Sequence, residues 1–172
     1  MSKQKYFSKG DPKPIYGNIA DYVKMEKAEK GSRFFIICPD CGMIRNNKRW
    51  FWDPKVKESD RKEASFKKCP GCEAIENGWA EGELTLKNKI LKLVPYQIEE
   101  LIKNLEEEYR HDDPKNRIVK INKAKNIWKV YTASVFLARR IGEELEKTYA
   151  SKVSFKFLKG DQFVRVVWED KA

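Results

Sequence analysis

Two short segments, Cys38-Pro39-Asp40-Cys41 and Cys69-Pro70-Gly71-Cys72, contain all four cysteines of this chain. Each Cys-X-X-Cys turn allows two sulfurs to approach one ion while nearby backbone N–H groups hydrogen-bond to them. Gly42, directly after the first pair, suits the tight backbone of such a knuckle. Two of these turns brought together form a closed tetrahedral site of four sulfurs, which is typical of structural zinc. The sequence therefore predicts one metal site with Cys38, Cys41, Cys69 and Cys72 as its ligands.

Two disulfides are the alternative use of these cysteines, and they require an oxidising compartment. Residues 1–7 carry basic residues but no apolar stretch of the secretory type, and no run approaches the 18 apolar residues that indicate a membrane span. We therefore expect a cytoplasmic protein without a membrane partner. In that setting thiols stay reduced, and paired Cys-X-X-Cys motifs predict metal binding.

The identity of the metal follows less directly from the spacing. The 27 residues between the pairs also resemble the spacing of rubredoxin, which holds a single iron. Here Glu73 follows the second pair where that pattern has glycine, and the intervening segment is strongly basic. We therefore expect one structural Zn²⁺, with iron as the less favoured cofactor. At least one of Trp50 and Trp52 is expected to cover the site rather than to stack on a nucleic-acid base.

The chain is basic, with 36 Lys and Arg against 26 Asp and Glu, a net charge of +10 and a pI near 9.4. Four thiolates around one Zn²⁺ carry a charge of −2, so the metal-loaded protein stays near +8. Residues 1–93 hold 20 basic and 13 acidic residues, whereas residues 94–172 hold 16 and 13. Polyanions are the natural partners of such a protein, and we expect the excess charge of residues 1–93 to meet a phosphate backbone.

Three parts are expected along the chain. Residues 1–31 are predicted to be a flexible basic N-terminal arm, because lysines, prolines and aromatic residues alternate there without a sustained apolar period. Residues 32–93 are predicted to form a zinc-ribbon-like module and a bridge. Within this part the expected elements are strands over 32–37 and 49–52, a short helix over 74–79 and a short strand over 83–86. Residues 94–172 are predicted to form a separate domain.

The third part shows a helix followed by a hairpin, twice. Apolar residues recur at helical spacing in two segments, as Ile98, Leu101, Ile102, Leu105 and Tyr109 and as Leu137, Ile141, Leu145 and Tyr149. Pairs of alternating strands are expected after each helix, over 117–122 with 127–132 and over 153–157 with 163–168. The predicted fold class is α+β, a zinc-ribbon-like module followed by an αββαββ domain. Its sheet is predicted to be four-stranded and antiparallel, with both helices on one face and an open opposite face rich in lysine, arginine and aromatic residues.

The second helix begins within the segment YTASVFLARRIG at 131–142. This segment, together with the order of the two cysteine pairs and the αββαββ domain, resembles a family of small bacterial zinc-ribbon proteins of unassigned activity. These proteins are in turn similar to part of the archaeal and eukaryotic adaptor family that binds the large ribosomal subunit for maturation and nuclear export. The resemblance covers about residues 38–168 and implies ribosome or RNA binding. The adaptor family has more Cys-X-X-Cys pairs and further domains with export signals, so export is not implied.

No constellation of residues typical of hydrolytic catalysis occurs in the sequence. His111 is the only histidine, and a lone histidine in a hydrophilic loop is more often a helix C-terminal residue than a base or a ligand. No glycine-rich phosphate loop, G-x-S-x-G or H-E-x-x-H motif occurs. We therefore expect no enzyme activity, and the sequence identifies no small-molecule substrate.

The favoured hypothesis is a non-catalytic zinc protein that associates with RNA or the ribosome and grips the phosphate backbone. The candidate nucleic-acid-binding residues are Lys48, Arg49, Lys55, Arg61, Lys62, Lys67 and Lys68 around the cysteines, and Lys123, Lys125, Arg139 and Arg140 in the third part. The alternative is a protein–protein adaptor in which zinc only folds the module. A rubredoxin-like electron carrier is the third and least favoured hypothesis.

Overall fold

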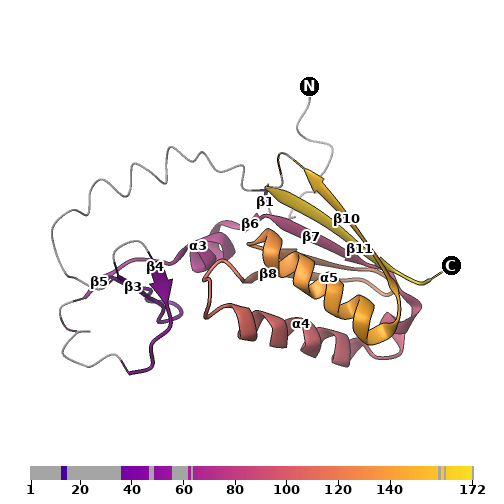
Figure 1. Cartoon of the computed structure of the whole chain (residues 1–172), viewed down its shortest axis with the longest axis horizontal. Coiled ribbons are helices and arrows are strands. Elements are labelled where there is room, and N and C mark those ends of the chain that lie inside the picture. Colours follow the sequence, from indigo (N-terminus) through magenta and orange to yellow (C-terminus); the bar gives the residue numbers. More distant parts are fainter. Residues whose placement is uncertain are drawn as a thin grey trace.

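The computed structural model describes residues 13–14, 36–46, 49–55, 62, 64–158, 160 and 162–171. The predicted arm, residues 1–31, lies outside these residues except for β1 (Lys13–Pro14), and so do the candidates Lys48 and Arg61. Figure 1 shows a small sheet at one end of the molecule and a larger unit of helices and strands at the other, with α3 (Pro70–Asn77) between them.

The small sheet carries the cysteine pairs and has the strand order β4-β3-β2-β5. Its strands are β2 (Ile36–Ile37), β3 (Ile44–Asn46), β4 (Arg49–Phe51) and β5 (Ser65–Phe66). β2 pairs with β3 in antiparallel and with β5 in parallel orientation. The strands predicted over 32–37 and 49–52 are present in the described residues as β2 and β4. We call residues 36–77 the metal module.

The helix predicted over 74–79 is present but begins earlier, at Pro70. Proline suits the first turn of a helix, and the side chain of Cys69 caps that turn by accepting from the N–H of Cys72. Gly78 ends the helix in the left-handed conformation, with φ of 64°. The second cysteine pair therefore lies in the first turn of a helix, whereas the helix was expected to begin only after the pair, at residue 74.

The large sheet has five strands in the order β10-β11-β7-β9-β8. These strands are β7 (Gly82–Leu86), β8 (Ile118–Lys123), β9 (Trp128–Thr132), β10 (Lys152–Leu158) and β11 (Phe163–Glu169). The two predicted hairpins are present, but the prediction of four antiparallel strands is wrong. β7 lies between the hairpins, parallel to β11 and antiparallel to β9. The side chains of β7 fit this central position, because Glu83, Leu84 and Leu86 are all buried and a central strand is covered on both faces.

Both long helices, α4 (Pro95–Tyr109) and α5 (Val135–Tyr149), pack on the same face of this sheet. α5 begins where the hydroxyl of Ser134 accepts from the N–H of Leu137 at 3.0 Å. The core joins both predicted apolar stripes to the sheet; it includes Ile98, Ile102, Leu105, Leu137, Ile141, Leu145, Leu84, Val130, Val166 and Trp168. η1 (Lys89–Lys92) connects β7 to α4. None of the described helices is long and apolar enough to cross a lipid bilayer.

The face of the sheet opposite the helices differs from the open, basic surface that was predicted. Tyr131 and Phe163 lie on this face and are only 0% and 1% exposed. Glu83 is also buried there, and its carboxylate lies 3.5 Å from the ammonium of Lys129. The centre of this face is therefore covered, and one of its cations is balanced by a carboxylate. β6 (Trp79–Ala80) forms a separate parallel pair with β1.

Candidate metal centre

The four cysteine sulfurs lie together, with every Sγ within 4.8 Å of the others. Zn–S bonds of about 2.3 Å at tetrahedral angles place sulfurs about 3.8 Å apart. The Sγ atoms of Cys41 and Cys69 are 3.6 Å apart, close to that value and far longer than a disulfide of about 2.05 Å. All four cysteines are free thiols. The donor set and its spacing fit a tetrahedral ion, so the predicted ligand set is brought together in the structure.

The first pair lies on a tight turn between β2 and β3. The N–H of Gly42 donates to the carbonyl of Cys38 at 2.9 Å, and the N–H of Cys38 donates to the carbonyl of Met43 at 2.8 Å. Gly42 has φ of 75°, a conformation that side chains rarely adopt. This turn is the knuckle that the sequence predicted, and glycine is required in it.

The first turn of α3 positions the second cysteine pair. The N–H of Cys69 donates to Cys38 Sγ at 3.3 Å, and the N–H of Cys72 donates to Cys69 Sγ at 3.5 Å. Backbone N–H groups at a helix N-terminus stabilise negative charge, so they would support the thiolate form that an ion binds once the thiol protons are displaced. Lys68 adds a link between the pairs, since its ammonium lies 3.4 Å from Asp40 and 2.7 Å from Glu76.

Apolar side chains from the small sheet close the site. Met43 is 3% exposed and packs with the buried cysteines, and Trp50 packs against the same cluster. Trp52 lies over the knuckle, because its ring would contact a Cβ at Gly42 at 3.4 Å. Both tryptophans therefore cover the site, which confirms the prediction for at least one of them.

The thiols titrate differently from one another without an ion. Hydrogen bonding from the Cys69 thiol lowers the pKa of Cys41 to about 5, although burial opposes this. The pKa of Cys69 is raised, first by its role as donor to Cys41 and then by burial. Burial raises the pKa of Cys72 to about 12. The metal-free cluster therefore favours negative charge on Cys41 over Cys69 and Cys72, whose protons an ion must displace.

The large unit supplies a cation beside the sulfurs. Arg117 donates from Nε to Glu106 at 3.0 Å and is mostly buried. Burial alone would lower the pKa of Arg117, but Glu106 and the charges of Cys72 and Cys41 raise it above its ordinary value. A dication with four thiolates keeps a net charge of −2, and Arg117 is placed to balance part of it.

Two further contacts join the metal module to the large unit. Gly71, between the second pair of cysteines, packs so closely on the loop after α4 that a Cβ would overlap the carbonyl oxygen of Pro114. The rings of Trp52 and His111 stack with centroids 4.9 Å apart and planes at 14°. His111 is therefore a packing residue at this junction. The sequence contained both residues but no signal that they meet partners so distant along the chain.

The candidate phosphate-binding residues divide into two groups. Arg49, Lys55 and Lys62 are exposed and Lys67 is half-buried, and no ion pair forms between these four side chains and the described acidic residues. In contrast, Lys68 binds Asp40 and Glu76, Lys123 binds Glu99, and Arg139 and Arg140 both bind Glu143. Lys125 is exposed on the β8–β9 turn. Lys48 and Arg61 lie outside the described residues.

Comparison with protein-family models, with curated proteins and with solved structures finds no match to this chain. The chemistry of the cysteine cluster and its surroundings therefore carries the functional argument by itself.

Proposed function

We propose that this protein is a non-catalytic zinc protein that associates with RNA, including ribosomal RNA, through the basic surface of its metal module. The observation that carries the proposal is a group of four cations that form no ion pair with the described acidic residues, Arg49, Lys55, Lys62 and Lys67, in the module whose cysteine cluster could hold one ion. Between positions 32 and 72 the sequence has ten basic and five acidic residues. Cations without internal partners are available for phosphate groups.

The role proposed for zinc is structural. Four cysteine donors satisfy a tetrahedral ion and leave no position for a substrate or a reactive water. Met43 and Trp50 cover the cluster, which further limits access to it. Zinc then fixes the small sheet and the adjoining segments that carry the basic residues, and binding takes place on the surface around the cluster.

Metal analysis of the purified protein tests the cofactor. We expect a colourless protein with one zinc per chain and no iron. A red protein with one iron per chain would instead establish the rubredoxin-like carrier and remove the structural role for zinc.

Salt-dependent RNA binding tests the phosphate grip. The probes are a ribosomal RNA fragment and an unstructured oligouridine, and the measurement is Kd by fluorescence anisotropy from about 50 to 200 mM salt. Each lost phosphate contact lowers the slope of log Kd against log salt by about 0.7–0.9. Replacing Arg49, Lys55, Lys62 and Lys67 with glutamine is therefore expected to lower the slope by about three.

A matched control replaces four lysines of the large unit, Lys87, Lys103, Lys115 and Lys147, with glutamine. This control removes the same charge from the chain, so an equal loss of slope would show a general effect of net charge. Affinity for RNA that is indifferent to salt in the wild-type protein would overturn the phosphate grip itself.

A protein–protein adaptor is the second candidate, because large apolar side chains are exposed away from the metal module. Leu93 is 78% exposed and Tyr96 is 69% exposed, and both lie at the start of α4. Exposed apolar residues that lie together are typical of protein contacts. Association with ribosomes that survives nuclease treatment and is lost in a Leu93→Ser, Tyr96→Ser variant would favour the adaptor.

A further inference from the structure

The two edges of the five-stranded sheet are not alike. At one edge, β8 has an irregular register between Ile118 and Lys120. The N–H of Ile118 there donates a hydrogen bond to the carboxylate of Glu106 at 3.0 Å. At the other edge, β10 pairs in unbroken register with β11 over all seven of its residues. In the part of the chain that the structure describes, β10 has no second neighbour. A long, regular edge strand is a template for a further strand.

The pairing pattern shows which residues of β10 face outward. On β11, the N–H of Val164 donates to Glu81 and the C=O of Trp168 accepts from Lys87, so these backbone groups point to the β7 side. Backbone direction alternates along a strand, so Val166 points the same way. The β10 residues opposite Val164 and Val166 are Phe157 and Phe155. Their N–H and C=O groups therefore point away from β11, toward the outer edge.

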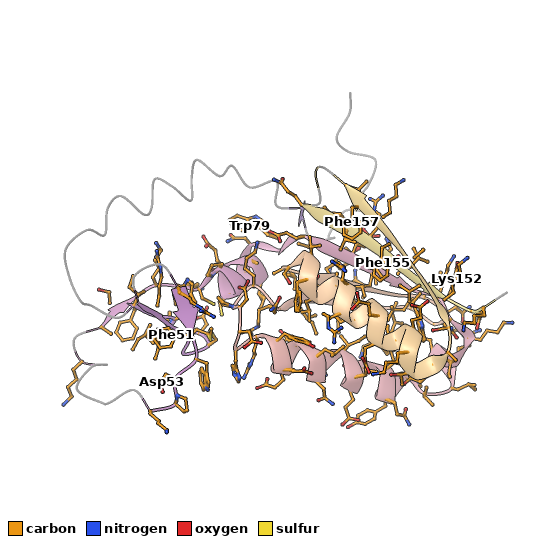
Figure 2. All side chains as sticks on the ribbon, in the orientation of Figure 1. Phe51, Asp53, Trp79, Lys152, Phe155 and Phe157 are labelled. Atoms are coloured by element: carbon orange, nitrogen blue, oxygen red, sulfur yellow. The ribbon has the colours of Figure 1, made fainter. Side chains whose placement is uncertain are left out.

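The side chains of the same two residues form an apolar surface beside this edge. Phe155 is 36% exposed and Phe157 is 41% exposed, and Figure 2 shows both next to α5. α5 approaches them closely, since a Cβ at Gly142 would lie 3.3 Å from the ring of Phe155. The guanidinium of Arg139 lies 5.9 Å from the centre of the Phe157 ring. We call Phe155, Phe157 and the outer edge of β10 the edge groove.

Charges of opposite sign mark the two ends of the edge groove. Arg139 lies at the Phe157 end, with its side chain 52% exposed. At the other end, the carboxylate of Glu146 accepts from the N–H of Val153 at 3.1 Å. That carboxylate stands where the carbonyl of a neighbouring strand would bond, so it ends the available edge at Val153. Glu143 lies one helical turn before Glu146 on α5.

We propose that the edge groove binds an extended segment of a partner protein, which adds to the sheet as a sixth strand beside β10. Main-chain hydrogen bonds to Phe155 and Phe157 would supply affinity, and apolar side chains of the segment would cover the two rings. The charges specify an acidic residue of the segment near Arg139 and a basic residue near Glu146. A polyanion such as RNA fits this surface poorly, because the Glu146 carboxylate lies at one end of it and Glu143 pairs with Arg139 at the other. The inference is independent of the RNA function proposed for the metal module.

Selection from a displayed library of random twelve-residue peptides on the full-length, zinc-loaded protein tests the inference. We expect enriched peptides with alternating apolar residues, an acid toward one end and a base toward the other. Amide resonances of Phe155 and Phe157 should shift and exchange more slowly with solvent when such a peptide binds. Enriched peptides that perturb amides elsewhere, or no enrichment above a blank surface, would overturn it.

Variants separate the edge groove from general effects. Phe157→Ala is expected to weaken the selected peptide at least tenfold, as for a central interface residue. Ser154→Ala, on the same strand but on its other face, is the matched control and should leave Kd unchanged. Arg139→Glu changes an exposed side chain, so the fold should stay intact even if Phe157→Ala disturbs it. Peptide binding that is lost in Arg139→Glu should be restored by a peptide whose acidic residue is changed to lysine. Failure of that rescue contradicts the charge assignment.

Two other possible occupants of the edge groove would give distinct experimental results. Concentration-dependent dimers in sedimentation experiments that disappear in Phe157→Ala would identify a second copy of this chain as the occupant and overturn the proposal. Single-stranded oligouridine that shifts the amides of Phe155 and Phe157 would likewise overturn it in favour of nucleic acid.

Discussion

The metal module and the five-stranded unit are stabilised by different forces. In the large unit, fifteen buried residues from the sheet, both long helices and η1 form one apolar cluster. In the described part of the metal module, the buried cluster around the site consists of Met43 and three of the cysteines, with Cys41 and Trp50 packed against it. A domain with a large core folds by burial of apolar surface, whereas a small module without one needs a metal. The comparison predicts that the two regions lose their structure independently.

Removal of the proposed zinc ion is expected to have the largest effect, and only on the metal module. Structural zinc contributes on the order of 10 kcal/mol in small modules. After chelation, the amide signals of β2, β3, β4 and the start of α3 should collapse to unfolded positions, while those of α4, α5 and the large sheet persist. The measurement is a ¹⁵N–¹H spectrum before and after chelator is added.

Cys38→Ser should reproduce the effect of chelation without any chelator, because Cys38 is a buried donor of the cluster. If the metal-free protein kept the amide signals of the metal module, the independence of the two regions would be contradicted. Packing around Trp50 would then be sufficient to fold the module.

Ile141→Ala is expected to act on the opposite region. Ile141 is fully buried in the cluster between α5 and the sheet. Truncation of a buried isoleucine to alanine costs about 2–5 kcal/mol. Urea unfolding followed by far-ultraviolet circular dichroism should show this loss, and zinc content should stay at one per chain. Loss of zinc in this variant would show that the two regions unfold as one cooperative unit.

A change of pH should sharpen the comparison, because only the metal module depends on thiolates. The raised pKa values of Cys69 and Cys72 mean that both thiols are protonated near pH 7 and must lose their protons to bind zinc. Zinc affinity is therefore expected to rise with pH, by about a hundredfold per unit from these two protons alone. Below about pH 5, protonation of Cys41 makes the fall steeper.

Calorimetric titrations in buffers of different ionisation enthalpy count the released protons directly. Zinc uptake without proton release at pH 7 would contradict the protonated thiols. In the metal-free protein, the free energy of unfolding of the large unit should not show this dependence on pH.

Gly71→Ala is expected to have the smallest effect and to act between the regions. The added Cβ would overlap the carbonyl of Pro114, so the metal module must move away from the loop after α4. Overpacking of this kind costs about 1–3 kcal/mol. We expect the stacked rings of Trp52 and His111 to separate, which should change their side-chain resonances, while both regions remain folded.

Gly78→Asn is the matched control for this variant. Gly78 has no atoms near its missing Cβ, and asparagine tolerates the left-handed backbone found there. Equal effects of the two substitutions would indicate that helix α3, and not the junction, had been damaged.

Local patterns in the sequence predicted most elements of the fold. The periods of α4 and α5 persist over four turns, and the alternation in β10 and β11 is clear, so their existence was confirmed. The sheet order was not predictable in this way. β7 is separated from β11 along the chain by both helices and three strands, and no local pattern indicates a pairing partner at that distance.

The ligand set was predictable because four cysteines in two pairs have few alternative uses. The surroundings of the site were not. Arg117 and His111 lie in the predicted domain and reach the cysteines only through the loop after α4. The start of α3 at Pro70 was also missed, because a Cys-X-X-Cys turn and a first helical turn have the same short spacing.

The central place of β7 has a consequence for the order in which the chain is synthesised. β7 emerges from the ribosome before any other strand of its sheet, and its parallel neighbour β11 is the last strand described. Leu84 and Leu86 therefore lack their neighbours on β11 until almost the whole chain has been made. Contacts between such distant segments slow folding. A fragment that begins at residue 94 would lack the strand on which both hairpins depend, whereas one that begins before Gly82 would keep it.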